Sequence, residues 1–131
     1  ILYLQYRNGY VINDNFFFNG ELESLGKWYR QLMGEGIGKL GKGITPTVSI
    51  GSTDLHSVAQ LYLGGPTNKY FTFYIAPGNS SVADSPITVP SRPVFDCFVS
   101  YIQNKSASDV LHIILDGVKV AFQKKSCRLL S

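Results

Sequence analysis

The sequence predicts an α/β fold, in which short strands alternate with amphipathic helices. Apolar runs of strand length are separated by longer stretches in which apolar residues recur at every third or fourth position. Glycines, prolines and helix-capping residues mark most of the boundaries between these two patterns. Alternation of this kind is typical of parallel β–α units that pack as layers, and 131 residues suit one domain with a hydrophobic core. We therefore expect residues 1–131 to form a single layered α/β domain.

The first forty residues predict a strand, a loop and a helix. Alternating apolar and polar side chains favour a short strand over Ile1–Tyr6, and the polar flanks of the phenylalanine run indicate a loop over Asn13–Gly20. A helix is expected to begin near Asn19 and to end at Gly36 and Gly38. Its predicted apolar face comprises Leu22, Leu25, Trp28, Tyr29, Leu32 and Met33.

Two further strands are expected on either side of a second helix. Ile44–Ile50 and Tyr70–Ala76 are apolar runs of strand length. Between them, Ser52–Asp54 supplies N-cap candidates for a helix that continues to Leu63, and the glycines and proline that follow end it.

The segment after the third strand is rich in proline and serine. This composition favours a long loop over residues 77–93, with a short strand at Ile87–Val89. Residues 94–103 fit either a strand or a helix, and we favour the helix.

The C-terminal segment predicts a capped helix and a closing strand. Ser106, followed three residues later by Asp109, matches a capping box with Asp in place of the usual Glu. We therefore expect a helix over Ser106–Lys125, and a final strand that begins within Cys127–Leu130.

Composition argues against several classes of protein. With 44% hydrophobic and 16% charged residues, the chain is expected to fold rather than to stay disordered. A net charge of +3, without a basic run longer than Lys124-Lys125, argues against a nucleic-acid partner. No apolar run approaches the ~20 residues that a membrane span requires, and the N-terminus lacks the pattern of a signal peptide. The two cysteines, Cys97 and Cys127, are expected to be free thiols in a reducing compartment.

The glycine-rich stretch Gly34–Gly43 matches two nucleotide-binding patterns. Residues 36–41 fit G-x-G-x-x-G, and residues 36–42 fit G-x-x-x-x-G-K. Both patterns need a strand before the glycines and a helix after them, so that amide N–H groups point at phosphate. Here a helix is expected before the glycines and a strand after them, so we predict a simple helix-to-strand connection and no nucleotide site.

Three polar residues are candidates for function: Gln31, Glu35 and His56. Gln31 and Glu35 are four residues apart, which places them on one face near the end of a predicted helix. A carboxylate flanked by glycines can approach a ligand closely and can act first as a base and then as an acid. His56 lies at the start of the next predicted helix, where the helix dipole favours an uncharged imidazole. From spacing alone, a solvated glutamate and a structural histidine would be the simpler interpretations.

Two motifs around these residues resemble the glucose-6-phosphate isomerase family. Residues 27–39, KWYRQLMGEGIGK, resemble the family's W-Y-R-Q-L-x-x-E-S-x-G-K. Residues 53–69, TDLHSVAQLYLGGPTNK, resemble its T-D-Q-H-S-x-x-Q-L-Y-L-x-G-P. The two motifs stand in the family's order, and the resemblance extends over Leu25–Phe73, more than a third of the chain.

The resemblance implies both a fold and an activity. The fold would be a three-layer α/β/α, doubly wound domain of the sugar-isomerase, flavodoxin-like type, and the chain would be a fragment covering most of the second such domain. The activity would be aldose–ketose isomerisation of glucose 6-phosphate to fructose 6-phosphate in glycolysis and gluconeogenesis, in the cytoplasm and without a metal or organic cofactor. Glu35 would be the catalytic base and Gln31 would bind the substrate. His56 would act at ring opening, contributed to the site of the neighbouring subunit in a homodimer.

The chain departs from the family pattern at two positions. Gly36 stands where Ser is usual, which removes a hydroxyl beside Glu35, and Leu55 stands where Gln is usual. The resemblance also places the family's phosphate-binding loop and an active-site arginine before Ile1, and a catalytic lysine after Ser131. Since the chain opens without Met, we expect a piece of a longer protein, and we expect residues 1–131 alone to be inactive.

Two other functions stay open on the sequence. One is a non-catalytic sugar-phosphate-binding or regulatory domain of the same fold, which the departures at Gly36 and Leu55 favour slightly. The other is a domain whose role is contact between subunits.

Overall fold

Strands and helices alternate along the chain in the computed structural model, which describes residues 1–75, 85–89, 99–124 and 129–130. The elements are α1 (Leu2–Arg7), β1 (Ile12–Phe17), α2 (Glu23–Gly36), β2 (Thr45–Ile50), α3 (Thr53–Gly64), β3 (Lys69–Tyr74), α5 (Ala107–Lys124) and β4 (Leu129–Leu130). Short 3-10 turns lie at Gly20–Leu22, Lys39–Gly41 and Ser100–Ile102.

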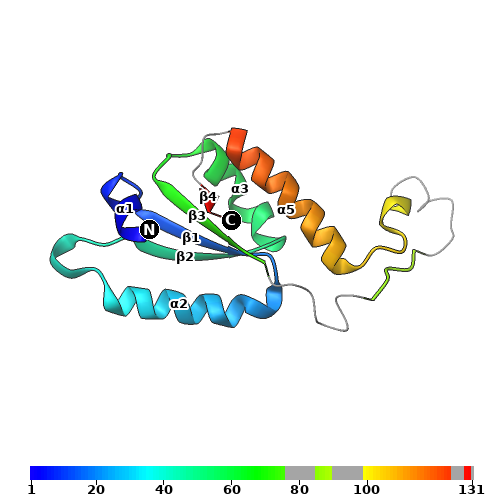
Figure 1. Cartoon of the computed structure of the whole chain (residues 1–131), viewed down its shortest axis with the longest axis horizontal. Helices are drawn as coiled ribbons and strands as arrows, with labels where there is room; N and C mark the ends of the chain where they lie inside the picture. Colours follow the sequence, from blue (N-terminus) through cyan, green and yellow to red (C-terminus); the bar gives the residue numbers. More distant parts are fainter. Residues whose placement is uncertain (76–84, 90–98, 125–128, 131) are drawn as a thin grey trace.

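Parallel strands form one sheet in the order β2-β1-β3-β4. In its register, Ile12 of β1 lies beside Thr45 of β2 and Lys69 of β3. Helix α2 covers one face of the sheet, and α3 and α5 cover the other (Figure 1). The chain therefore passes from β1 to β2 over one face and returns past β1 to β3 over the other. The predicted three-layer, doubly wound α/β fold is confirmed.

The main hydrophobic core lies between the sheet and the helices α3 and α5. Its buried side chains are Phe16, Phe18, Phe71, Phe73, Leu115 and Phe122. Phe122 of α5 stands edge-on to Phe71 of β3, with ring centroids 4.8 Å apart and ring planes at 89°, the geometry that aromatic quadrupoles favour. Tyr62 and Leu63 of α3 pack against the same cluster, which fixes that helix on the sheet.

Gly26 brings α2 close to the opposite face of the sheet. A Cβ atom at this position would lie 2.7 Å from Cε2 of Phe17 and 2.8 Å from Cγ1 of Val48. No larger side chain fits there without moving the helix, so glycine sets the distance between α2 and the strands β1 and β2.

The buried side of α2 is narrower than the predicted apolar face. Half of the predicted side chains are half-buried, namely Leu22, Tyr29 and Met33. The other half are exposed, namely Leu25, Trp28 and Leu32. The prediction was therefore wrong for this second set, although the helix itself lies where it was expected.

The N-terminal segment is a helix and not the predicted strand. Helix α1 places Leu2 and Tyr6, four residues apart, along one cavity beside Ile44. Tyr3 lines the same cavity, and its hydroxyl accepts a hydrogen bond from Arg7 Nη1 at 3.3 Å. Over only six residues, apolar side chains that fit alternation also fit the spacing of a helical turn, and the prediction chose the wrong period.

The predicted loop over Asn13–Gly20 is mostly strand β1, which lies between β2 and β3. Its polar residues Asn13, Asp14 and Asn15 are at most 1% exposed. They can be buried because neighbouring strands and helices supply hydrogen-bond partners for their side chains. Polarity was therefore misleading at this position.

Several predicted boundaries are confirmed. Asn19 caps the turn that leads into α2, since its Oδ1 accepts a hydrogen bond from the Glu21 N–H at 2.9 Å. The capping box of α5 also forms: the Ser106 N–H donates to Asp109 Oδ2 at 2.9 Å, and the Asp109 N–H donates to Ser106 Oγ at 3.0 Å. The strand expected at Ile87–Val89 is wrong, because that region forms only an isolated bridge between Pro86 and Ser106.

Some predictions fall on residues that the structure does not describe. These are most of the loop over residues 77–93, the first half of the segment 94–103, and both cysteines, Cys97 and Cys127. Of that second segment, Ser100–Ile102 forms a 3-10 turn.

Candidate active site

Gln31 and Glu35 lie in the last two turns of α2, and both side chains are exposed. Gln31 Nε2 donates a hydrogen bond to Glu35 Oε1 at 3.0 Å, so the predicted shared face exists. A carboxylate at the C-terminal end of a helix faces the negative end of the helix dipole, and the amide of Gln31 offsets part of that repulsion. The pair thus presents an oriented carboxylate to the solvent.

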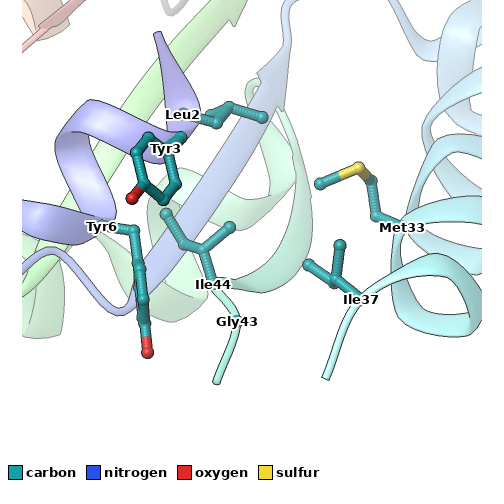
Figure 2. A pocket seen from close by; sticks show the side chains of 7 residues that line it. All are labelled: Leu2, Tyr3, Tyr6, Met33, Ile37, Gly43 and Ile44. Carbon is teal, nitrogen blue, oxygen red and sulfur yellow. The ribbon is translucent and has the colours of Figure 1, made fainter. Parts of the chain in front are cut away.

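A cavity of about 250 Å³ lies beside this end of α2. Figure 2 shows Met33 and Ile37 on one side of it and the side chains of α1 on the other, with Ile44 between them. The walls are almost entirely apolar. A second hollow, of about 360 Å³, shares Ile37, Gly43 and Ile44 with the first. Its other lining residues are Gly34, Gly38, Gly41, Lys42, Thr45 and Pro46.

The glycine-rich stretch connects the C-terminus of α2 to the N-terminus of β2, as predicted. Gly38 has a φ of 97°, a left-handed conformation that allows the chain to leave the helix there. Helix–glycine–strand is the reverse of the order that a nucleotide-binding loop requires.

His56 lies in the first turn of α3, and its side chain is exposed. Asp54 anchors this turn, because its Oδ2 accepts a hydrogen bond from the Ile50 N–H at 2.7 Å and its Oδ1 accepts one from Ser57 Oγ at 3.0 Å. Leu55, one of the two departures from the family pattern, packs against the hydrophobic core. The apolar side chain at this position is therefore explained by packing.

The structure does not bring His56 together with Gln31 and Glu35 in one chain. Helix α2 returns from the end of β1 to the start of β2, so Glu35 lies near the N-terminal ends of the parallel strands. Helix α3 follows the end of β2, so His56 lies near the C-terminal ends of the strands. The two helices also cover opposite faces of the sheet (Figure 1). Strands of six residues separate these two ends by about 20 Å.

Sequence reasoning missed a buried carboxyl group at the centre of the sheet. Asp14 of β1 is 0% exposed. Its Oδ1 accepts hydrogen bonds from Thr47 Oγ1 at 2.5 Å, Tyr62 OH at 3.0 Å and Ser49 Oγ at 3.1 Å. Burial raises the pKa of Asp14 above its ordinary value of 3.8, against the opposing effect of these hydroxyl donors. Burial likewise raises the pKa of Tyr62 to about 12.

The sequence held one signal for this group. An acidic residue between two short apolar runs, in V-I-N-D-N-F-F-F, is compatible with a central strand if its neighbours can donate hydrogen bonds.

Within the described part of the chain, no three His, Cys, Asp or Glu side chains lie close enough to hold a metal ion. None of the helices described is long and apolar enough to cross a membrane.

The fold and the exposed Gln31–Glu35 pair define a doubly wound α/β protein with a carboxylate presented at the end of one helix. In sequence, the chain is 43% identical to the glucose-6-phosphate isomerase of Methanocaldococcus jannaschii over 76 residues, which is 58% of this chain and 19% of that protein. It is 34% identical to the glucose-6-phosphate isomerase of Streptococcus pyogenes serotype M6 over 119 residues, which is 88% of this chain and 25% of that protein.

The chain thus belongs by sequence to the glucose-6-phosphate isomerase family, and the predicted resemblance is confirmed. It spans between 15% and 25% of the length of the curated relatives that it matches. In structure, it matches the crystal structure of a hypothetical protein from Thermus thermophilus with a TM-score of 0.82 and 22% identity. That match covers 98% of this chain and 30% of the other, and it supports the fold alone. No protein-family model matches the chain.

Proposed function

We propose that residues 1–131 are one sugar-isomerase domain of a glucose-6-phosphate isomerase that interconverts glucose 6-phosphate and fructose 6-phosphate. The observation that carries the proposal is the exposed, hydrogen-bonded pair of Gln31 and Glu35, at the end of a helix whose sequence matches the family motif. The whole enzyme would act in the cytoplasm, in glycolysis and gluconeogenesis, as a homodimer.

Glu35 would transfer the proton. Its carboxylate would remove the proton from the sugar carbon next to the carbonyl, to give an enediolate, and would return that proton to the adjacent carbon, while the proton of the C2 hydroxyl passes to the former carbonyl oxygen. One base that moves one proton between neighbouring carbons needs no redox partner, so the proposal includes no cofactor. Gln31 would contact a sugar hydroxyl as well as Glu35.

His56 would act at ring opening, in a site that also contains residues of a second chain. Its exposed position in the first turn of α3, at the opposite end of the strands from Glu35, supports a role outside the site of its own chain. An uncharged imidazole there can take a proton from a sugar hydroxyl.

A second candidate is a non-catalytic sugar-phosphate-binding or regulatory domain of the same fold. The observation that favours it is Gly36, which replaces the serine expected beside the base. Such a domain would bind the sugar phosphate without exchanging its C2 hydrogen with the solvent.

The test is Glu35→Gln in the full-length protein, with Glu21→Gln, an exposed glutamate near the start of α2, as the control. The glutamine keeps the shape and removes the proton acceptor, so turnover should fall by at least ~10²-fold while sugar-phosphate binding changes little. Normal exchange of the substrate's C2 hydrogen in the Glu35→Gln protein would contradict the role of Glu35. Binding without turnover in the unsubstituted protein would favour the regulatory domain.

A further inference from the structure

A buried polar layer lies between the sheet and α2, where an apolar one would be expected. Asn13 and Asn15 of β1 point to this face and are each 1% exposed. Their side chains bond to one another, because Asn15 Nδ2 donates to Asn13 Oδ1 at 3.2 Å. Buried amides add little net stability over apolar side chains of similar volume, and in some proteins a buried polar layer specifies one arrangement of the elements that pack on it.

The layer is tied to both neighbouring strands. Asn13 Nδ2 donates to Thr72 Oγ1 of β3 at 3.3 Å, and Asn15 Nδ2 donates to the Thr47 carbonyl of β2 at 3.1 Å. The two amide side chains of β1 are therefore held by hydrogen bonds to β2 and β3. This leaves Asn13 Oδ1 and Asn15 Oδ1 as acceptors in fixed positions.

Two tyrosines bond to these acceptors, and they come from different elements. Tyr29 of α2 donates its hydroxyl to Asn13 Oδ1 at 3.3 Å. Tyr74, the last residue of β3, donates its hydroxyl to Asn15 Oδ1 at 3.2 Å. The two bonds are alike in length and chemistry, but only the first joins the sheet to the helix that carries Glu35.

We propose that the Tyr29–Asn13 hydrogen bond is a positioning device for Glu35, which it holds in place by fixing the rotation and the register of α2 on the sheet. The inference rests on the proposed function. Gly26 allows close packing but is compatible with small sliding movements, whereas a hydrogen bond to a buried amide selects one position. Glu35 lies six residues after Tyr29, about 9 Å further along the helix axis, so a rotation of α2 displaces its carboxylate directly.

The experiment compares Tyr29→Phe with Tyr74→Phe in the full-length enzyme. Each substitution removes one hydroxyl and keeps the ring, so both proteins should fold. Tyr74→Phe should cost at least as much stability as Tyr29→Phe, because Asn13 Oδ1 keeps the hydrogen bond from Asn15 Nδ2 when the Tyr29 hydroxyl is removed. For Tyr29→Phe, kcat should fall about tenfold and KM should change by less than about twofold, because reacting groups are displaced while binding is retained. For Tyr74→Phe, both constants should stay within about twofold of the unsubstituted enzyme.

A second measurement does not depend on activity. Backbone amide hydrogen exchange of residues 32–36 should be faster in Tyr29→Phe than in Tyr74→Phe, since only the former loses the bond to α2. Equal exchange rates, or equal losses of kcat, in the two variants would overturn the positioning role. Retained turnover in Glu35→Gln would instead overturn the proposed function. The backbone amide hydrogen exchange of residues 32–36 would still decide whether Tyr29 orders the end of α2.

Discussion

Glu35 lies near the N-terminal ends of the parallel strands and His56 lies near their C-terminal ends, on helices that cover the two opposite faces of the sheet. The crossover from β1 to β2 through α2, and the return through α3, determine this separation. If both residues serve one reaction, they must come from two copies of the chain.

If Glu35 of one subunit and His56 of the other share a site, we expect the inactive variants Glu35→Gln and His56→Ala to restore one another's activity. In a dimer of one Glu35→Gln subunit and one His56→Ala subunit, one site would have both residues intact and the other would have neither. Random mixing of subunits should therefore restore about one quarter of the sites of the unsubstituted enzyme. The measurement is the isomerase activity of the separately purified variants before and after they are unfolded and refolded together.

The control is the doubly substituted chain refolded with either single variant. Such dimers hold no site with both residues intact, so activity should stay at the level of the single variants. Absence of any gain in the main mixture, with dimers shown to form, would mean that Glu35 and His56 do not share a site across subunits.

Gly36 should accept serine without strain. A Cβ atom at Gly36 would meet nothing within 4 Å, and its φ lies outside the left-handed range. Glycine within a helix costs about 0.5–1 kcal/mol relative to alanine, so Gly36→Ser should leave the free energy of unfolding unchanged or raise it by a few tenths of a kcal/mol. In the full-length enzyme it would also return a hydroxyl to the neighbourhood of Glu35.

Gly38→Ser is the matched comparison, two residues along. Gly38 has a φ of 97°, which L side chains rarely adopt, so this variant should lose about 1 kcal/mol or more. Urea denaturation of both variants measures the difference. Equal losses at the two positions would show that α2 does not end as described.

The sequence motifs located the candidate residues, and helix periodicity correctly placed Gln31 and Glu35 on one face. Their separation from His56 follows from the predicted strand over Ile44–Ile50, because Glu35 precedes β2 and His56 follows it. The position of β1 could not be predicted in the same way. The polar residues Asn13, Asp14 and Asn15 are typical of a loop and not of a buried strand. Their burial depends on hydrogen-bond partners that are distant in the sequence, such as Thr47 and Tyr62 for Asp14.

Local signals succeeded where the interactions are local. Ser106 and Asp109 are three residues apart, and their reciprocal bonds follow from that spacing. The exposure of Trp28 could not be inferred in this way, because periodicity gives the width of an apolar face but not which part of it meets the sheet.

The capping box should contribute measurably to the stability of α5. Ser106→Ala removes the side-chain acceptor of the Asp109 N–H, so the free energy of unfolding should fall by about 1 kcal/mol. Ser24→Ala, at an exposed serine in the first turn of α2, is the control and should cost much less. Thermal and urea denaturation of both variants provide the measurement. A loss at Ser106 no larger than that at Ser24 would mean that the cap is not formed in solution.

Asp14 should make the stability of the protein fall as the pH rises. Burial is the largest influence on this carboxyl group and raises its pKa in the folded state above 3.8. Well below pH 3.8, Asp14 is protonated in both the folded and the unfolded chain, so its ionisation does not change the free energy of unfolding. As the pH rises, the unfolded chain releases its proton first, which favours unfolding until the pH has passed the folded-state pKa.

Asp14→Asn removes this dependence, because the amide is similar in shape and stays uncharged. The free energy of unfolding of the unsubstituted protein should therefore decline relative to that of Asp14→Asn as the pH rises above the ordinary carboxyl pKa of 3.8, as measured by urea denaturation at intervals of pH. Asp116→Asn, at an exposed aspartate of α5 that lies 3.6 Å from Lys119, controls for the loss of a carboxylate at the surface. Since desolvation acts only on a buried group, the decline should persist in Asp116→Asn. Parallel pH profiles for the unsubstituted protein and Asp14→Asn would show that the carboxyl group of Asp14 is solvated in the folded state.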